Sequence, residues 1–183
     1  MSLKRVLING LFIKPGRVGG AEQYLNNLLL EFSKTSQVEF TLLLNKKYKG
    51  KYHSVVNAFS VRYVDVRIGG RVYDYFLVFF VNLKSYDVIF SPNYITPLFT
   101  GRTNVRLVTV IHDLQYLHFP ENFALVKKVF LFISHLYTLL KADSVLTISD
   151  FVLDDIRMKF KGIGRKKLQR IYNAVDVSKY NES

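Results

Sequence analysis

The sequence predicts an α/β domain whose mainly parallel sheet is flanked by helices, and three observations support this fold class. Short apolar runs alternate along the chain with segments of helical periodicity, which is the pattern of β-α-β units. The first run, residues 5–9 (RVLIN), is apolar on both faces, as a central strand of a parallel sheet is. The 183 residues, 49% of them hydrophobic and 22% charged, suffice for one globular domain. We therefore expect a Rossmann-like sheet with residues 5–9 at its centre.

The first helix is expected over residues 21–32, after a loop that contains Pro15, Gly16, Gly19 and Gly20. Its apolar residues recur at i, i+3, i+4, i+7, i+8 and i+11, and they are Ala21, Tyr24, Leu25, Leu28, Leu29 and Phe32. This spacing places an apolar stripe along one face of the helix, and the stripe is predicted to pack on the sheet.

The remaining elements continue the same alternation. Strands are expected at residues 38–44, 61–66, 87–90, 105–111, 144–148 and 168–172, and helices at residues 72–83, 123–141 and 149–160. The basic, glycine-containing segments 46–52 and 161–167 are predicted to be a loop and a turn. No internal repeat or linker divides the chain.

Composition excludes several kinds of site. The chain has no cysteine, which excludes disulfides and thiolate metal sites and fits a reducing cytoplasmic compartment. Its first residues lack the apolar region and cleavage site of a signal peptide. The longest apolar stretch, residues 123–140, contains Lys127, Lys128 and His135, which favours a buried or surface-lying helix over a membrane span.

The formal net charge of +12 predicts attraction to anions. Phosphates, acidic lipid headgroups and nucleic acid all remain candidates, and a generally basic, solvated surface is the alternative. No nucleic-acid-binding motif accompanies the charge.

Polar residues follow three of the predicted strands, at the edge where open α/β sheets bind ligands. The segment Gly19-Gly20-Ala21-Glu22 opens the first helix. Glycines let a ligand approach the backbone, and a helix N-terminus offers free N–H groups to an anion. Contact with a phosphate or diphosphate is therefore one interpretation, and an ordinary glycine-rich turn is the other.

His112 and Asp113 follow the long strand at residues 105–111. A histidine at this edge can hydrogen-bond a sugar hydroxyl and can titrate near neutral pH. The alternative is a loop histidine held by a neighbouring carboxylate. Of the other histidines, His53 and His118 fall in a loop and a turn, and His135 lies on an apolar helix where a core role is favoured.

Ser149 and Asp150 end the strand at residues 144–148, and Ser149 suits the N-cap of the next helix. Capping alone would explain this serine. The sequence contains no nucleophile elbow, Walker loop, complete dinucleotide fingerprint or metal-ligand spacing.

Four segments in order carry a family resemblance: GGAEQYLNNLLLEF (19–32), VTVIHDLQYLHFPENF (108–123), ADSVLTISDFVLDDI (142–156) and IYNAVD (171–176). They resemble the Gly-rich loop, the HDL-type segment, the T-x-S-x-F helix start and the closing N-G-V-D of the N-terminal domain of a GT-B glycosyltransferase of family 4. The HDLQYLHFPENF stretch is most similar to mannosyl- and rhamnosyltransferase-like members that build bacterial surface polysaccharides. Ala174 stands where the closing motif usually has glycine.

The resemblance implies a domain over residues 1–176, the start of an interdomain linker at 177–183, and a C-terminal donor-binding domain that this sequence does not contain. Family members transfer a hexose from a nucleotide-diphosphate sugar with retention at the anomeric carbon, without an essential metal, and no other cofactor is expected. The N-terminal domain holds the acceptor.

Site residues are carried over by position in the motifs. Gly19 and Gly20 would approach the donor, with Glu22 in the same segment, and His112 would bind a hydroxyl of the transferred sugar. The residues that would line or brace the cleft are Asp113, Ser149 and Asp150, and those that would mark the interdomain hinge are Asn173 and Asp176.

The expected function is therefore that of the acceptor-side domain of a retaining glycosyltransferase, with a glycan or lipid-linked acceptor and no activity in isolation. Its expected location is the cytoplasm, either free or attached peripherally to the inner face of the membrane. The alternative is a noncatalytic membrane- or partner-binding subunit of a split glycosyltransferase, docking through basic loops and aromatic helices on anionic lipid or a partner.

Overall fold

The fold is a single seven-stranded sheet in which every pairing between neighbouring strands is parallel. The computed structural model describes residues 3–16, 20–66, 70–98, 104–163 and 167–172. The strands are β1 (Lys4–Asn9), β2 (Val38–Asn45), β3 (Ser60–Val64), β4 (Val88–Ser91), β5 (Arg106–Ile111), β6 (Ser144–Thr147) and β7 (Leu168–Arg170). Their order is β3-β2-β1-β4-β5-β6-β7. The predicted Rossmann-like fold class is confirmed.

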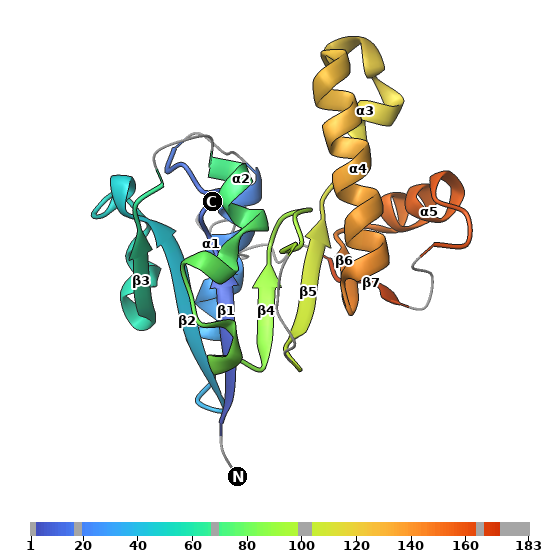
Figure 1. The fold of residues 1–183 in the computed structure, drawn as a ribbon. Coiled ribbons are helices and arrows are strands. Elements are labelled where there is room, and N and C mark those ends of the chain that lie inside the picture. The colour runs from blue at the N-terminus through green and yellow to red at the C-terminus, as the bar shows by residue number, and fades with distance from the viewer. Residues whose placement is uncertain (1–2, 17–19, 67–69, 99–103, 164–166, 173–183) are drawn as a thin grey trace, which may run out of the picture.

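The first strand is central, as its apolar sequence predicted. β1 pairs with β2 on one side and with β4 on the other. After β3 the chain returns across β1 to form β4, so the order of strands reverses between β1 and β4 (Figure 1). In open α/β sheets such a reversal leaves a crevice at the carboxyl ends of the strands, where ligands bind.

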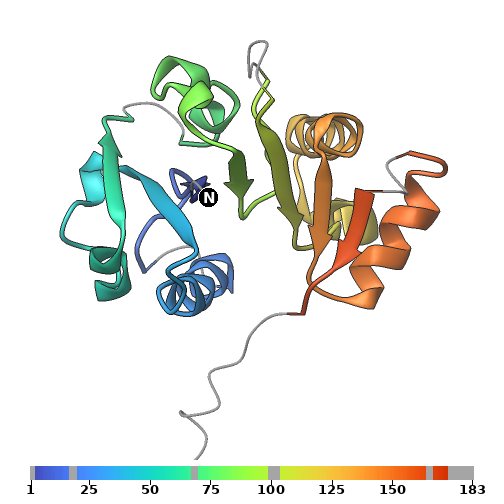
Figure 2. The same cartoon turned by 90° about the horizontal axis from the view of Figure 1, so that it is seen from below.

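Helices cover both faces of the sheet (Figure 2). They are α1 (Gly20–Phe32), α2 (Gly70–Tyr75), α3 (Gln115–His118), α4 (Leu125–Lys141) and α5 (Asp150–Lys159). α1 lies on one face, and α2 and α4 lie on the other. Side chains alternate along β1, so that Ile8 packs with Leu25 and Leu29 of α1 while Leu7 packs with Leu77 on the opposite face. A third cluster joins α4 and α5 to β5 and β6.

The segment predicted as one helix over residues 72–83 is broken. α2 ends at Tyr75, and 3₁₀ turns follow at Leu77–Phe79 and Leu83–Ser85. The segment is rich in valine and aromatic residues, which form helices weakly, and the Asn82 side chain accepts a hydrogen bond from the Lys84 backbone N–H at 3.2 Å. Tertiary contacts bury Leu77 without requiring a continuous helix.

Within the described residues, no helix combines the length and the apolar character that crossing a bilayer requires. α4 is the longest helix of this part of the chain, at 17 residues, and in Figure 1 its first half extends beyond the carboxyl ends of the strands.

Candidate functional site

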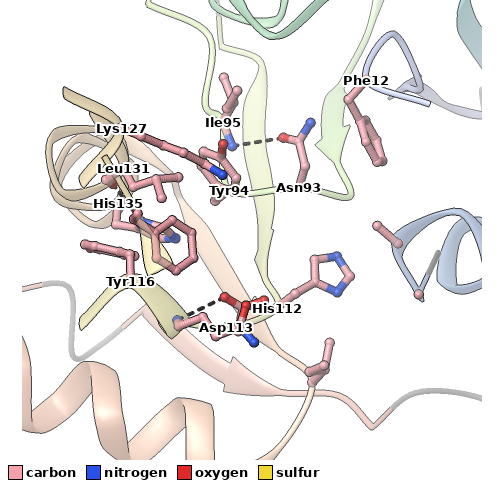
Figure 3. Close-up of a pocket in the computed structure, with 15 residues that line it drawn as sticks. Phe12, Asn93, Tyr94, Ile95, His112, Asp113, Tyr116, Lys127, Leu131 and His135 are labelled. Carbon is pink, nitrogen blue, oxygen red and sulfur yellow. Dashed lines mark hydrogen bonds between the residues drawn. The ribbon is translucent and has the colours of Figure 1, made fainter. Parts of the chain in front are cut away.

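A cavity of about 560 Å³ lies at the carboxyl ends of the strands, where the strand order reverses. The residues that line it come from the segments after β1, β4, β5 and β6, from the start of α1, and from α3 and α4; they include Phe12, Gly20, Asn93, Tyr94, His112, Asp113, Tyr116, Phe123, Lys127 and His135. In Figure 3, Phe12 lies on one side and the α4 residues on the other, with His112 between them. The cavity thus occupies the edge at which the sequence placed its candidate residues.

His112 follows β5 directly, and its ring is fixed by two contacts. Nε2 lies 3.0 Å from the carbonyl oxygen of Pro92, and the ring meets that of Tyr24 edge-on at a centroid distance of 4.9 Å. Because a carbonyl oxygen only accepts hydrogen bonds, Nε2 carries the proton of the neutral ring, and Nδ1 keeps a free lone pair. Burial lowers the pKa of His112, against the opposing effects of the Pro92 carbonyl and the Asp113 carboxylate. Neutral His112 therefore offers one hydrogen-bond acceptor.

Asp113 and Gly20 lie on the same cavity. Asp113 is exposed, and its Oδ1 accepts a hydrogen bond from the Gln115 backbone N–H at 3.0 Å, which starts α3. Gly20 opens α1, and among the described residues no atom outside its chain neighbours and its own helix backbone lies within 4 Å of the position that a Cβ would take there. A ligand can thus approach the N-terminal N–H groups of α1 at close range.

Glu22, Ser149 and Asp150 do not line this cavity. The Glu22 carboxylate accepts a hydrogen bond from the Gly16 backbone N–H at 2.9 Å and borders a shallower polar groove beside α1. Ser149 is the N-cap of α5, since its Oγ accepts from the Val152 backbone N–H at 3.2 Å.

The Asp150 carboxylate is held on the surface by two partners. It accepts hydrogen bonds from the Arg170 guanidinium and, at 2.9 Å, from the Tyr172 hydroxyl. Both contacts hold the pKa of Asp150 below its usual range, and the hydrogen bond from Arg170 has the larger effect. The structure thus brings together Gly20, His112 and Asp113 and places Glu22, Ser149 and Asp150 elsewhere. Gly19, Asn173 and Asp176 lie outside the described residues.

A comparison with known proteins identifies the family of this chain. The model of glycosyltransferase family 4 matches residues 18–179 of the chain. The chain belongs to glycosyltransferase family 4. No curated protein matches it.

Two solved structures share the fold of this family 4 domain. Anabaena HepE, in complex with UDP-glucose, matches with a TM-score of 0.64 and 18% identity, over 98% of this chain and 46% of HepE. The lipopolysaccharide outer core galactosyltransferase WaaB, in its apo form, matches with a TM-score of 0.57 and 15% identity, over 96% of this chain and 47% of WaaB. The chain thus spans about half the length of these structures. Its fold is that of the N-terminal domain of a GT-B glycosyltransferase, as the sequence resemblance implied.

Sequence reasoning missed part of the cavity of this family 4 domain. Asn93 and Tyr94 follow β4, and the polar Ser-Pro-Asn that ends this strand could have marked them. Asn93 is buried, and its Oδ1 accepts from the Ile95 backbone N–H at 2.9 Å, which shapes the loop (Figure 3). His135 was expected to be a core residue, and it is buried, but it also lines the cavity. No pattern in the sequence indicates that second property.

Lys127 is the cationic residue of the cavity wall on α4. Its Nζ lies 4.7 Å from the centroid of the Phe123 ring, which positions the ammonium group by a cation–π contact. No group of three or more histidine, aspartate or glutamate residues in the described part of the chain could hold a metal ion.

Proposed function

We propose that this chain is the acceptor-side domain of a retaining glycosyltransferase that moves a hexose from a nucleotide-diphosphate sugar to a glycan or lipid-linked acceptor. The observation that carries the proposal is the cavity at the strand-order reversal, with neutral His112 in its wall. Family membership and the solved neighbours, one bound to UDP-glucose and one a lipopolysaccharide galactosyltransferase, support it. On the same grounds we propose a role in bacterial surface polysaccharide synthesis, on the cytoplasmic side of the membrane.

The cavity has the features that hold a sugar. Aromatic side chains such as Phe12, Tyr94 and Tyr116 offer flat apolar surfaces to the C–H faces of a pyranose, while His112 offers an acceptor to a hydroxyl. The N-terminus of α1 opens into the same cavity and favours an anion such as a diphosphate. Catalysis here would consist of positioning the acceptor and stabilising charge on the departing diphosphate.

We propose that transfer also needs a second domain that binds most of the nucleotide sugar, because the solved neighbours are about twice as long as this chain. The chain alone would bind nucleotide sugars weakly and transfer nothing. The test compares the purified chain with an enzyme in which it is joined to a family 4 donor-binding domain. A panel of nucleotide sugars is assayed with glycan and lipid-linked acceptors.

We expect the two-domain enzyme to transfer sugar and the purified chain to transfer none. Turnover by the purified chain, or micromolar binding of a nucleotide sugar measured by calorimetry, would contradict the requirement for a second domain. A two-domain enzyme that binds the donor and transfers no sugar to any acceptor would contradict the transferase function.

We also propose that the domain docks on an anionic membrane surface through the outer face of α4, defined by Leu125, Val126, Val129, Ile133 and Leu140. These five side chains are 50 to 83% exposed, although they are all apolar. The chain carries a net charge of +12. An exposed apolar face on a strongly basic domain favours an anionic bilayer over a neutral one. A noncatalytic subunit of a split enzyme would use the same face to dock. The transfer assay distinguishes this alternative from the acceptor-side domain of a transferase.

A further inference from the structure

His135 forms part of the inner wall of the cavity, and its ring is held between two tyrosines. The ring of Tyr94 stacks on it at a centroid distance of 4.9 Å and that of Tyr116 at 5.4 Å, with interplanar angles of 28° and 17°. The side chain is buried, with 2% of the residue exposed. Figure 3 shows His135 on α4, beside Tyr116 and Leu131. Packing on both faces fixes the plane of the imidazole.

The hydrogen bond of His135 also fixes its tautomer. Nδ1 lies 2.7 Å from the carbonyl oxygen of Leu131, one helical turn earlier. Because this oxygen only accepts, Nδ1 carries the ring proton. Burial lowers the pKa of His135 to about 4, although the Leu131 carbonyl and the Asp113 carboxylate act in the opposite direction. At neutral pH the ring is therefore uncharged, and Nε2 has a lone pair and no hydrogen.

Among the residues that the structure describes, none donates a hydrogen bond to Nε2 of His135. The atom is also shielded from bulk solvent. A buried acceptor without a donor costs free energy, and native proteins satisfy such groups with a protein donor, an ordered water or a ligand. His135 borders the cavity, so a small shift of its ring or of its neighbours would bring Nε2 within reach of a donor on a ligand there.

His112 has a matching property, with the roles of its nitrogens exchanged. Its Nε2–H donates to the Pro92 carbonyl, which leaves Nδ1 as the acceptor. The cavity thus contains two neutral imidazoles, each with one nitrogen occupied by a backbone carbonyl and one lone pair left over. Two such lone pairs attract hydroxyl hydrogens and repel the oxygens of an anion. With tyrosine rings beside them, they suit the hydroxyls of a sugar ring.

We propose that Nε2 of His135 accepts a hydrogen bond from a sugar hydroxyl, making His135 a second sugar-binding residue beside His112. This inference rests on the proposed function of the cavity. The hydroxyl belongs either to the acceptor sugar or to the hexose of the donor, and the two sources share the same chemistry.

The test is a titration of ¹⁵N-labelled chain with two probes, followed through the imidazole nitrogen resonances and carried to high probe concentration because the chain alone is expected to bind weakly. Methyl α-D-glucopyranoside represents an acceptor sugar, and UDP-glucose represents a donor. A hydroxyl bonded to Nε2 of His135 moves that resonance upfield, which a purely structural histidine would not show. The probe that moves it identifies the source of the hydroxyl.

Two variants complete the test. His135→Phe keeps the stacked ring and removes both nitrogens, so we expect the dissociation constant of the active probe to rise about 5- to 10-fold. His135→Gln restores an acceptor and should recover part of this loss. His53→Phe, outside the cavity, is the matched control and should leave the dissociation constant unchanged.

A shift at His112 without one at His135, together with unchanged affinity of His135→Phe, would overturn this inference and leave the proposed function standing. It would mean that an ordered water, not a ligand, satisfies Nε2. If neither probe moves either histidine, both the inference and the proposed sugar-binding role of the cavity are wrong.

Discussion

At the scale of single residues, His112 and His135 share an electrostatic consequence of their burial. Burial keeps each ring neutral and holds its pKa below the ordinary value, while a backbone carbonyl fixes which nitrogen carries the proton. Between the ordinary pKa and the lowered one, the unfolded chain binds more protons than the folded chain. Stability therefore rises with pH across this window and is lost as the pH falls.

For His135 the window runs from about pH 6.5 down to about pH 4. We expect the free energy of unfolding to fall by about 3 kcal/mol between pH 7 and pH 4 through this residue alone. Asp113 opposes the effect, because its carboxylate favours the charged ring. Urea unfolding of the chain and of His135→Phe at several pH values measures the difference. An equally steep pH dependence in the variant would show that His135 is not the group responsible.

Ser149 permits a second prediction at this scale. It caps α5 and lies off the cavity, so Ser149→Ala should destabilise the domain by about 1 kcal/mol and leave the transfer rate of a two-domain enzyme unchanged. Ser149→Asp retains a capping oxygen and is the matched control. Thermal melting and initial rates, measured on the same preparations, distinguish a capping role from contact with substrate. A reduced rate at unchanged stability would instead place Ser149 in contact with substrate, which is the role that the motif resemblance implied.

The sequence singled out His112 as a candidate and gave no sign of the function proposed for His135, for a physical reason. His112 follows a strand at the ligand edge, and this position can be read from local pattern. The environment of His135 comes from Tyr94 after β4 and Tyr116 on α3, which are distant in the sequence. Helical spacing shows only that His135 belongs to an apolar helix.

At the scale of elements, strands were predicted more accurately than the segment between β3 and β4. The strand segments are short apolar runs flanked by polar or turn residues, so local pattern and tertiary burial agree. Over residues 72–83 the apolar content suggested a helix, yet the chain forms α2 and a succession of 3₁₀ turns. Burial of Leu77, Val81 and Leu83 against the sheet decided the conformation there.

The exposed apolar face of α4 leads to a prediction about membrane binding. We expect the chain to bind vesicles that contain anionic lipid and to bind neutral vesicles weakly, because each basic residue near such a surface contributes about 1 kcal/mol. Raising the salt from 0.1 M to 1 M shortens the Debye length from about 10 Å to about 3 Å and should release the protein. Sedimentation with vesicles at both salt concentrations measures this.

The outer face of α4 is tested by the double substitution V126E/V129E. Both side chains are at least half exposed, so folding should be retained while vesicle binding falls several-fold. Leu30→Glu, on the exposed side of α1, is the control and should bind as the unmodified chain does. Equal binding to neutral and anionic vesicles, or full binding by the double variant, would contradict membrane docking. If a protein partner covers this face instead, the variant loses the partner and keeps its vesicle binding.

At the scale of the whole molecule, the sequence predicted the class of fold and the edge of the sheet that holds the cavity. Apolar runs alternating with amphipathic segments determine a parallel sheet, and the polar residues after β1, β5 and β6 mark its carboxyl edge. The side chains that meet at the strand-order reversal could not be derived, because their contacts depend on how loops and helices pack in three dimensions. The structure supplies the wall formed by Tyr94, Tyr116 and His135.

The central claim is that this cavity holds the sugar during transfer, and His112→Ala in a two-domain enzyme tests it most directly. If His112 binds a sugar hydroxyl, the initial rate should fall by about 10- to 1000-fold, as expected when a hydrogen bond to the transition state is lost. The melting temperature should fall only slightly, because the ring makes one hydrogen bond and one aromatic contact with the residues that the structure describes and is partly exposed. Rate and melting temperature are measured on the same preparation. A variant that is clearly destabilised but transfers sugar at a near-normal rate would contradict the account.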